Sequence, residues 1–340
     1  MEMPKLPPSA SLQERELRLI EQRLLRLENS ANEALGLARL GLAPQLRRLL
    51  SRFIMPRLWV YQQYSTRRLR IPERYFAEAA PEALLRFAIV TPSLNQAQFI
   101  KATIDSVLEQ NYPNVAYLVQ DGGSNEETIE VLKSCGAGLQ WRSEADSGQA
   151  NAINRGFKRV QGDIMAYLNS DDVLLPGTLS YVARFFSENP DVDVVYGHRI
   201  YIDADGLEIG RCVLPAHDSE VFKWADYIPQ ETSFWRRRVW EAVGPFDETF
   251  NFALDWDFLL RSQQAGFRFR RLPRFLACFR VHDDQKNASM MLVGQKEMRR
   301  IRVEHLGALP GAYDVRQAIK GYLLRQAIHD LMYRLRLFRY

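Results

Sequence analysis

The spacing of apolar residues changes at about residue 84, and this change separates an N-terminal segment from the rest of the chain. Before about residue 84, apolar side chains recur every three or four positions, most regularly from Leu17 to Ala34. Ser11 and Glu14 precede that seam with the spacing of a capping box, so we expect a helix to begin there. The seam is too short to separate a coiled coil from a helix that packs on this chain or on a second copy.

Residues 45–64 place arginines between Leu, Phe, Ile and Trp side chains. This composition is typical of a helix that lies on an anionic membrane surface. A connector with solvated arginines would have the same composition, and the sequence leaves both interpretations open.

From about residue 84 the pattern changes to short apolar runs that alternate with amphipathic stretches. It predicts strands over 85–91, 115–120, 164–168 and 192–196, and helices over 99–110 and 176–186. Such alternation is typical of an α/β fold with a mostly parallel central sheet flanked by helices. Beyond residue 198 the alternation fades, and we expect further helices over 256–265 and after residue 313.

These changes of pattern predict three regions. Residues 1–84 form a helical, arginine-rich extension, residues 85–290 an α/β domain, and residues 291–340 a C-terminal amphipathic helical region. In the last region, one side of the expected helix carries Leu324, Ile328, Leu331, Leu335 and Phe338.

The composition excludes several classes of protein. No run approaches the ~20 apolar residues that a membrane-spanning helix needs, and the first residues lack the apolar core of a secretory signal. The 3 cysteines form no CxxC pair, which argues against a disulfide scaffold or a structural zinc site. We therefore expect a cytoplasmic protein.

The formal net charge of +4 conceals an uneven distribution. No acidic residue lies between Glu33 and Glu73, an interval that contains Arg39, Arg47, Arg48, Arg52, Arg57, Arg67, Arg68 and Arg70. The C-terminal region repeats this bias with Arg316, Lys320, Arg325, Arg334, Arg336 and Arg339. Clustered cations attract anionic lipid headgroups by about 1 kcal/mol each, so we expect association with the inner face of the cell membrane.

Two other partners for the basic regions stay open, namely an acidic partner or a second copy that dimerises through the N-terminal helices. Neither basic region contains a motif that reads nucleic acid, so nucleic acid is not an expected partner.

Polar residues follow three of the expected strands, at the edge where parallel sheets bind ligands. The sharpest group is Asn169, Ser170, Asp171 and Asp172, because adjacent carboxylates at a strand end are costly unless a cation uses them. Oxygen ligands of this kind suit Mg²⁺ or Mn²⁺, which would bridge to a diphosphate. The alternative is a solvated acidic turn that caps the next helix.

Two further groups could hold a nucleotide. Asp121 ends an apolar strand, and the glycines that begin with Gly122 would let a base or ribose approach the backbone closely. Asp146 could contact a base or ribose in the same way, with Asn151 projecting one turn further along the helix. A plain turn at Asp121 and a helix N-cap at Asp146 are the competing interpretations.

Two residues in the second half of the chain are candidates for chemistry. Asp255 lies at the start of an expected helix, a rigid position from which a carboxylate could act as a general base on a hydroxyl. Structural acids are also common there, because the helix dipole favours them. His282 lies among polar residues and could be a metal ligand beside Asp171 and Asp172, or a diphosphate contact.

Taken in order, these motifs resemble the family 2 glycosyltransferases of the bacterial polysaccharide type, which are inverting enzymes with a GT-A fold. The resemblance covers residues 86–290. It is carried by VTPSLNQAQFI, VQDGGS, EADSGQANAINRGF, GDIMAYLNSDD, PQETSFWRRRVWEAVGPFDE, LDWDFLLR and FRVH.

The resemblance implies roles on the donor side. Thr91 and Pro92 would end the first strand at the nucleotide, while Asp121 and Asp146 would hold the base and ribose. Asp171 matches the metal-ligating aspartate of the D-x-D motif.

The resemblance also implies roles on the acceptor side. Asp255 matches the general base. Glu231 lies in a segment that is near the acceptor in such enzymes, and it is the reserve candidate for the base.

Three residues depart from the family pattern. Asn169 replaces the first aspartate of D-x-D, Asn125 replaces an aspartate after Asp-Gly-Ser, and Leu254 replaces the acid that often precedes the base. The first change bears on the ribose or metal contact, and the last leaves the assignment of the base to one residue.

We therefore expect an inverting hexosyl- or N-acetylhexosaminyltransferase that uses a nucleoside diphosphate sugar, Mn²⁺ or Mg²⁺, and a glycan or lipid-linked acceptor. A nucleotidyltransferase is the first alternative, although residues 91–95 lack its Gly-rich, Arg- and Lys-containing loop. A non-catalytic scaffold, supported by Asn169 and Leu254, is the second.

Overall fold

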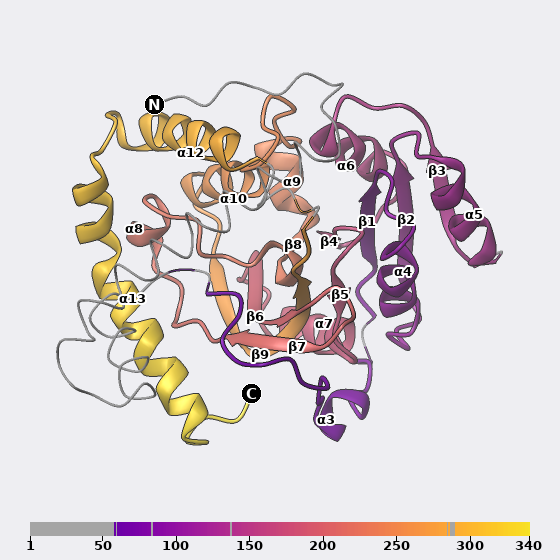
Figure 1. Ribbon diagram of the computed structural model, residues 1–340, viewed down its shortest axis with the longest axis horizontal. Coiled ribbons are helices and arrows are strands. Elements are labelled where there is room, and N and C mark those ends of the chain that lie inside the picture. The colour runs from indigo at the N-terminus through magenta and orange to yellow at the C-terminus, as the bar shows by residue number, and fades with distance from the viewer. Residues whose placement is uncertain (1–57, 59, 83, 137, 284, 286–289) are drawn as a thin grey trace. The chain divides into compact units, whose positions relative to one another are not determined.

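The computed structural model describes residues 58, 60–82, 84–136, 138–283, 285 and 290–340, which belong to one compact unit (Figure 1). The helix expected over 11–34, the larger part of segment 45–64 and a dimer formed through the N-terminal helices lie outside these residues.

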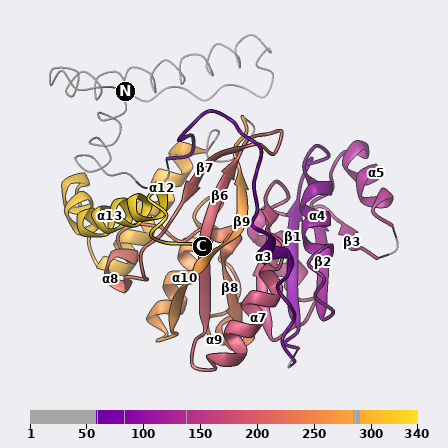
Figure 2. The ribbon, with the colours of Figure 1, turned by 90° about the horizontal axis from the view of Figure 1, so that it is seen from below.

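Within the described residues, nine strands form one sheet in the order β3-β2-β1-β4-β8-β6-β9-β5, with β7 paired to β6 (Figure 2). The strands are β1 (Phe87–Ser93), β2 (Val115–Asp121), β3 (Gln140–Ser143), β4 (Ile164–Tyr167), β5 (Val173–Leu174), β6 (Val194–Ile202), β7 (Glu208–Cys212), β8 (Phe234–Arg236) and β9 (Phe269–Arg280).

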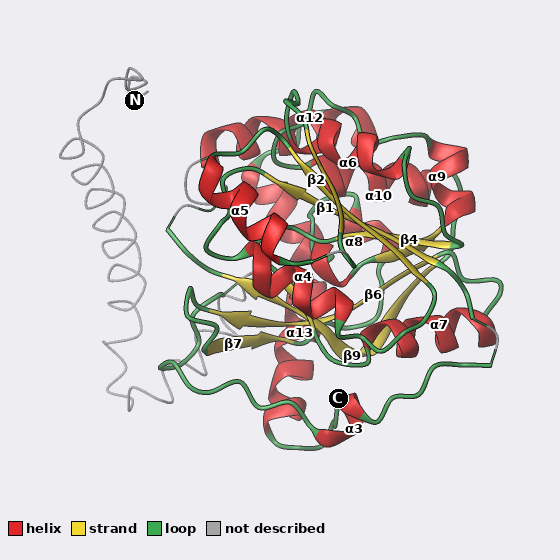
Figure 3. Ribbon diagram, turned by 90° about the vertical axis from the view of Figure 1, so that its right-hand side faces the viewer, coloured by secondary structure: helices red, strands yellow, loops and turns green. Residues whose placement is uncertain are grey.

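Helices cover both faces of this sheet (Figure 3). They are α3 (Glu73–Phe76), α4 (Ile100–Leu108), α5 (Glu126–Ser134), α6 (Gln149–Phe157), α7 (Thr178–Glu188), α8 (Ser219–Phe222), η1 (Gln230–Thr232), α9 (Arg237–Val243), α10 (Leu254–Gln264), α12 (Met291–Leu306) and α13 (Ala312–Arg334).

The central strand β1 is buried along its whole length because it packs on both faces. Ala88 and Val90 face a core shared with α6 and α10, while Phe87 and Ile89 face a core shared with α4 and α7. A strand buried on both sides reads as a continuous apolar run, which explains why the sequence pattern located it. The predicted α/β fold is confirmed.

The direction of the strands changes across the sheet. β1 is parallel to β2 and β4, and β2 is parallel to β3, as the alternating pattern indicated. Beyond β4, the short strand β8 runs antiparallel to β4 and β6, and β9 returns parallel to β6. The register aligns Ser93 with Asp121 and Asp121 with Ser143, so the ends of β1, β2 and β3 meet at one edge.

A break in the pairing of β6 with β9 lies at Gly197 and prepares a binding place for η1. The backbone N–H of Gly197 donates to Thr232 Oγ1 at 3.2 Å, and that hydroxyl donates to the carbonyl of Pro229 at 2.8 Å. A Cβ at Gly197 would lie 2.7 Å from the carbonyl oxygen of Arg274, so the close approach requires glycine. The bulge thereby fixes the turn that carries Gln230 and Glu231.

The described end of segment 45–64 is extended, not helical, which corrects the membrane-helix interpretation for those residues. The backbone of Gln63 donates to Ile209 of β7 at 2.8 Å, and Arg67 forms a β-bridge with Glu208. These hydrogen bonds use backbone groups that a helix would need for itself. The buried Glu208 also pairs with the Arg67 side chain at 2.6 Å and with Arg211 at 2.8 Å.

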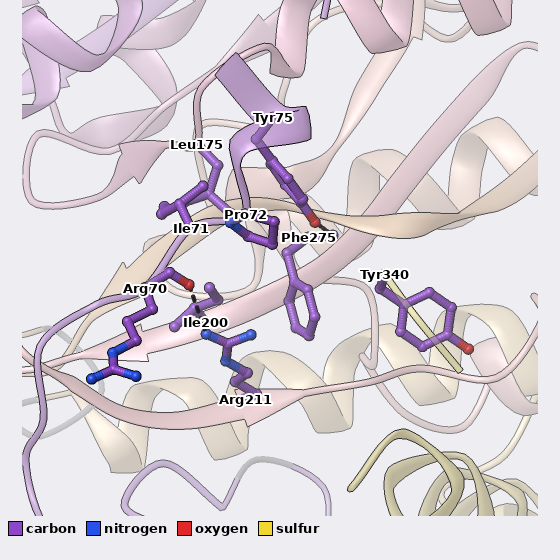
Figure 4. A pocket seen from close by; sticks show the side chains of 9 residues that line it. All are labelled: Arg70, Ile71, Pro72, Tyr75, Leu175, Ile200, Arg211, Phe275 and Tyr340. Carbon is purple, nitrogen blue, oxygen red and sulfur yellow. Dashed lines mark hydrogen bonds between the residues drawn. The ribbon is translucent and has the colours of Figure 1, made fainter. Parts of the chain in front are cut away.

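A small pocket lies between residues 70–75 and the strands β6, β7 and β9. Figure 4 shows its lining, which consists of Arg70, Ile71, Pro72, Tyr75, Leu175, Ile200, Arg211, Phe275 and Tyr340. The lining contains neither a carboxylate nor a histidine, so the pocket is a packing seam and not the centre of the predicted chemistry.

The C-terminal helix α13 packs through Tyr322 and Leu323, the two residues that are buried on it. The Tyr322 ring stacks on Tyr227 with centroids 4.2 Å apart. Among the residues that the structure describes, no helix is both long enough and apolar enough to cross a membrane. The domain boundaries at residues 84 and 290 stay predictions.

Candidate active site

Asp121 organises the loop at the end of β2. Its Oδ2 accepts from the backbone N–H groups of Gly123 and Ser124, at 3.1 and 2.9 Å, and from Ser143 Oγ at 2.6 Å. The side chain of Ser124 donates to Oδ1. The carboxylate is buried and holds the loop together through these hydrogen bonds.

Asp146 is the carboxylate that reaches this loop from the other side. A Cβ on Gly122 would lie 2.5 Å from Asp146 Oδ2, so a larger residue there would displace the Asp146 carboxylate. The other oxygen of Asp146 accepts from the N–H of Gly148 at 2.9 Å, ahead of α6. The structure thus brings Gly122 and Asp146 together, half-buried, at the edge where a nucleotide was expected.

Three predicted donor residues point elsewhere. Thr91 and Pro92 are buried within β1, and the Thr91 hydroxyl shares a hydrogen bond with Tyr117 at 3.0 Å inside the core. Asn151 donates to Glu248 at 2.9 Å and so ties α6 to the segment before α10. Their predicted contact with the donor stays untested, and in this structure their side chains serve packing.

Asn169 is the centre of a network of side-chain amides. Its Oδ1 accepts from Gln149 Nε2 at 2.7 Å, and its Nδ2 donates to Gln230 Oε1 at 3.1 Å. The same Nδ2 lies 3.4 Å from Asp172 Oδ2, and Gln230 in turn donates to the carbonyl of Tyr167 at 2.7 Å. An aspartate could still accept from Gln149, but it could not donate to Gln230 or Asp172, because an ionised carboxylate has no hydrogen to donate.

The structure pairs Asp171 with His282. Their Oδ2 and Nε2 atoms lie 3.1 Å apart, and the His282 ring packs on Phe99 with centroids 4.5 Å apart. Arg280 donates from Nε to the Asp171 carbonyl at 2.8 Å and from its backbone to Asp172 Oδ1 at 3.0 Å. The predicted ligand set is therefore brought together in part, because the Asp172 carboxylate is buried and turned into the fold.

The donor chemistry at this pair fits a divalent ion. A carboxylate oxygen and an imidazole nitrogen at the end of the sheet are compatible with Mn²⁺, and Mg²⁺ commonly takes one or two carboxylates with the rest of its shell from phosphate and water. Ser170 is buried in the same turn.

The described chain gathers another set of potential ligands at Asp257, Glu304 and His305, between α10 and α12. There Arg261 pairs with Asp257 at 2.9 Å, so a structural ion pair accounts for that carboxylate.

Asp255 lies in the first turn of α10 and accepts from the Trp256 N–H at 2.9 Å. Burial raises the pKa of Asp255 to about 6, which its backbone hydrogen bonds and the charge of Arg199 only partly oppose. The carboxyl group lines a small hollow together with Tyr167, Gln230, Ser233, Trp235, Phe246, Phe258 and Leu259. A half-buried carboxylate with this pKa suits proton abstraction near neutral pH.

The structure adds two residues that the sequence reasoning missed, Arg199 and Asp226. Arg199 of β6 pairs with Glu231 at 2.6 Å, and both side chains are buried. Burial raises the pKa of Asp226, and the charge of Asp255 raises it further. Arg199 could have been noticed in the sequence, because it is a charged residue in the largely apolar segment that forms β6. Nothing in the sequence indicated that Asp226 lies near Asp255.

Comparison with known proteins bears on the family and the fold of this chain. Residues 88–259 match the family model described as glycosyl transferase family 2. The PGL/p-HBAD biosynthesis glycosyltransferase of Mycobacterium tuberculosis is 30% identical over 180 residues, which cover 52% of this chain and 68% of the relative. An uncharacterized glycosyltransferase of Rickettsia prowazekii is 27% identical over 180 residues, covering 50% and 56% of the two chains.

Solved structures of S. aureus TarS share the fold. TarS 1–349 in complex with UDP-GlcNAc gives a TM-score of 0.55 at 18% identity, covering 70% of this chain and 71% of that chain. A second TarS structure gives a TM-score of 0.51 at 20% identity, and there the match covers only 43% of that chain. At these identities the likeness establishes the architecture alone.

Proposed function

Because the chain belongs to glycosyl transferase family 2, we propose that it moves a hexosyl or N-acetylhexosaminyl group from a nucleoside diphosphate to a hydroxyl of a glycan or lipid-linked acceptor, with inversion. The observation that carries this proposal is the position of Asp255. This half-buried carboxylate has a raised pKa and lines a hollow together with Gln230. Gln230 in turn accepts a hydrogen bond from Asn169, in the turn that contains Asp171.

In this proposal the reaction is a single displacement. The nucleotide lies along Gly122 and Asp146. Asp255 takes the proton of the acceptor hydroxyl as its oxygen bonds to the anomeric carbon and the bond to the diphosphate breaks. Asp171 and His282 would hold Mn²⁺ or Mg²⁺, which when bound supplies positive charge for the departing diphosphate.

We further propose that the protein works at an anionic membrane surface. Supporting observations are the arginine-rich sequence before residue 73 and the exposed apolar side chains of α13 between cations. Dimerisation through the N-terminal helices is a separate proposal that rests on the sequence seam alone.

The experiment is a panel of UDP-glucose, UDP-galactose, UDP-GlcNAc, UDP-GalNAc, GDP-mannose and dTDP-rhamnose, with and without Mn²⁺. A true donor should raise the melting temperature with its concentration, because it binds only the native state. The same donor should release free sugar slowly in the absence of an acceptor. A scaffold would bind without any release, and a nucleotidyltransferase would instead form pyrophosphate from a nucleoside triphosphate and a sugar phosphate; either result contradicts the proposal.

A further inference from the structure

We infer that Glu231 recognises a hydroxyl of the transferred sugar, and that Arg199 holds the Glu231 carboxylate in place for this purpose. The inference rests on the proposed transferase function. It gives Glu231 a role other than that of a reserve base.

Glu231 is fixed on one side by a buried ion pair. Its Oε2 lies 2.6 Å from Nη2 of Arg199, and the two residues are 2% and 6% exposed. The Arg199 guanidinium packs over the Phe279 ring, 4.8 Å from its centroid. Because Thr232 anchors the same turn at the bulge of β6, neither partner is free to turn away.

The second carboxylate oxygen of Glu231 is buried and accepts no hydrogen bond from any other residue that the structure describes. Leaving a buried charged acceptor unsatisfied is costly, so such atoms in native proteins usually have a partner. An ionised carboxylate only accepts hydrogen bonds, so the missing partner must be a donor such as a hydroxyl.

Glu231 lies beside both parts of the proposed site. Its neighbour Gln230, in the same turn η1, accepts from Asn169 at 3.1 Å and lines the hollow of Asp255. In a single displacement, the sugar ring occupies the space between the diphosphate and the base. In this inference, the missing donor is therefore a hydroxyl of that ring.

The ion pair also argues against Glu231 as the base. Proton transfer to Glu231 would neutralise the partner of a buried guanidinium, and an unpaired buried cation is strongly destabilising. Among the described residues, no cation forms an ion pair with Asp255, which accepts from backbone N–H groups instead.

The test compares Glu231→Gln, Glu231→Asp and wild type by calorimetry with Mn²⁺. The probes are the panel donor that binds wild type most tightly and its parent nucleoside diphosphate. Glu220→Gln is the control, because Glu220 is an exposed glutamate that pairs with Lys223 at 2.8 Å, away from the proposed site.

We expect both Glu231 variants to bind the nucleoside diphosphate as wild type does, which also shows that they are folded. Their affinity for the nucleotide sugar should fall roughly 10- to 100-fold, as is typical for a lost hydrogen bond to a charged group. The control should bind both probes unchanged.

Three results would overturn the inference. They are unchanged affinity for the nucleotide sugar in both variants, an equal loss for both probes, and the disappearance of the acid limb of the kcat profile in Glu231→Gln, which would make Glu231 the base. Failure of wild type to bind any nucleotide of the panel would instead refute the transferase proposal on which the inference rests.

Discussion

As the proposed base, Asp255 would meet two requirements that conflict in most carboxylates, since a base must be ionised at the working pH and must also bind a proton well. Its half-buried position in the first turn of α10 reconciles them by raising its pKa to about 6. Replacing Asp255 by Asn should lower kcat for sugar transfer by roughly 10²- to 10⁴-fold, while the dissociation constant of the donor stays the same.

The control for this substitution is Asp257→Asn in the same helical turn. Asp257 bonds to Arg261 at 2.9 Å, so its loss should lower the melting temperature but preserve transfer. Wild-type turnover in Asp255→Asn would show that another group is the base.

The same carboxyl group predicts the pH dependence of transfer. With its pKa raised from 3.8 to about 6, Asp255 is protonated below that value, and kcat should fall about tenfold per pH unit there. The charge of Glu231 contributes to the raised pKa of Asp255, so the position of the limb depends on both carboxylates.

Stability should change with pH in the opposite direction to activity. The native state binds the proton more tightly than the unfolded chain, so stability falls as pH rises from about 4 to 6. Asp255→Asn should therefore melt no lower than wild type at pH 8, which thermal unfolding at two pH values would check.

Asn125 and Asn169 both depart from the family pattern, and the structure predicts different results for restoring aspartate. Asn125 caps α5 by accepting from the Thr128 N–H at 3.2 Å, a bond that aspartate can make equally well. Asn169 donates to Gln230 at 3.1 Å, and a carboxylate in its place would face Asp172.

Asn169→Asp should lower stability by about 1–3 kcal/mol and Asn125→Asp should leave it unchanged, as measured by denaturant unfolding. Equal stability of the two variants would show that the amide network contributes little to the free energy of unfolding.

At the scale of elements, the bulge in β6 controls the turn that carries Gln230 and Glu231. Gly197→Ala would press a methyl group against the Arg274 carbonyl and Leu276, at 2.7 and 2.5 Å. We expect a loss of about 1–3 kcal/mol together with weaker donor binding, because η1 is displaced.

Gly138→Ala is the matched control for the bulge. Nothing lies within 4 Å of the added atom there, so thermal unfolding and donor affinity should match wild type. If Gly197→Ala kept both properties too, the bulge would not position the turn.

The sequence predicted the elements whose own residues are buried, because their burial shows directly in the pattern of apolar positions. β1, β2 and β4 are apolar runs, and the ends of β2 and β4 located Asp121 and Asp171. β8 and η1 escaped prediction because they are three residues long and depend on β6 for their hydrogen bonds.

The same reasoning separates the site residues. A polar residue after a strand reveals where a ligand can bind, so Asp146 and Asp171 were accessible to sequence reasoning. The pairing of Arg199 with Glu231 joins positions 32 residues apart, and no local pattern encodes it. The Thr91 side chain points into the core toward Tyr117. That orientation depends on tertiary packing, which the local sequence does not show.

At the scale of the whole molecule, α13 and Leu335, which directly follows it, expose apolar side chains that the fold does not cover. Leu324, Ile328 and Leu335 are 44%, 42% and 60% exposed, and cations lie on both sides of them in the sequence. This arrangement is typical of a helix that rests on an anionic lipid surface.

The protein should therefore sediment with vesicles that contain phosphatidylglycerol, and less so at high salt. Changing all three side chains to Gln should weaken binding without lowering the melting temperature. Leu108→Gln, at a position that is 46% exposed on α4, is the control. Unchanged vesicle binding by the triple variant would remove α13 from the membrane contact, and a change in oligomeric state would assign this face to a second copy.

The seam between residues 60–75 and the sheet bears on how the chain can be shortened. The family match begins at residue 88, yet Tyr75, 1% exposed, accepts from the Phe275 backbone at 3.2 Å and lies beneath Arg274 at 4.0 Å. A truncation at the family boundary would keep every predicted catalytic side chain and still strip one wall from β9 and one cation from Glu208. The family match and the compact unit thus begin at different residues, and recombinant fragments should begin at or before Leu58.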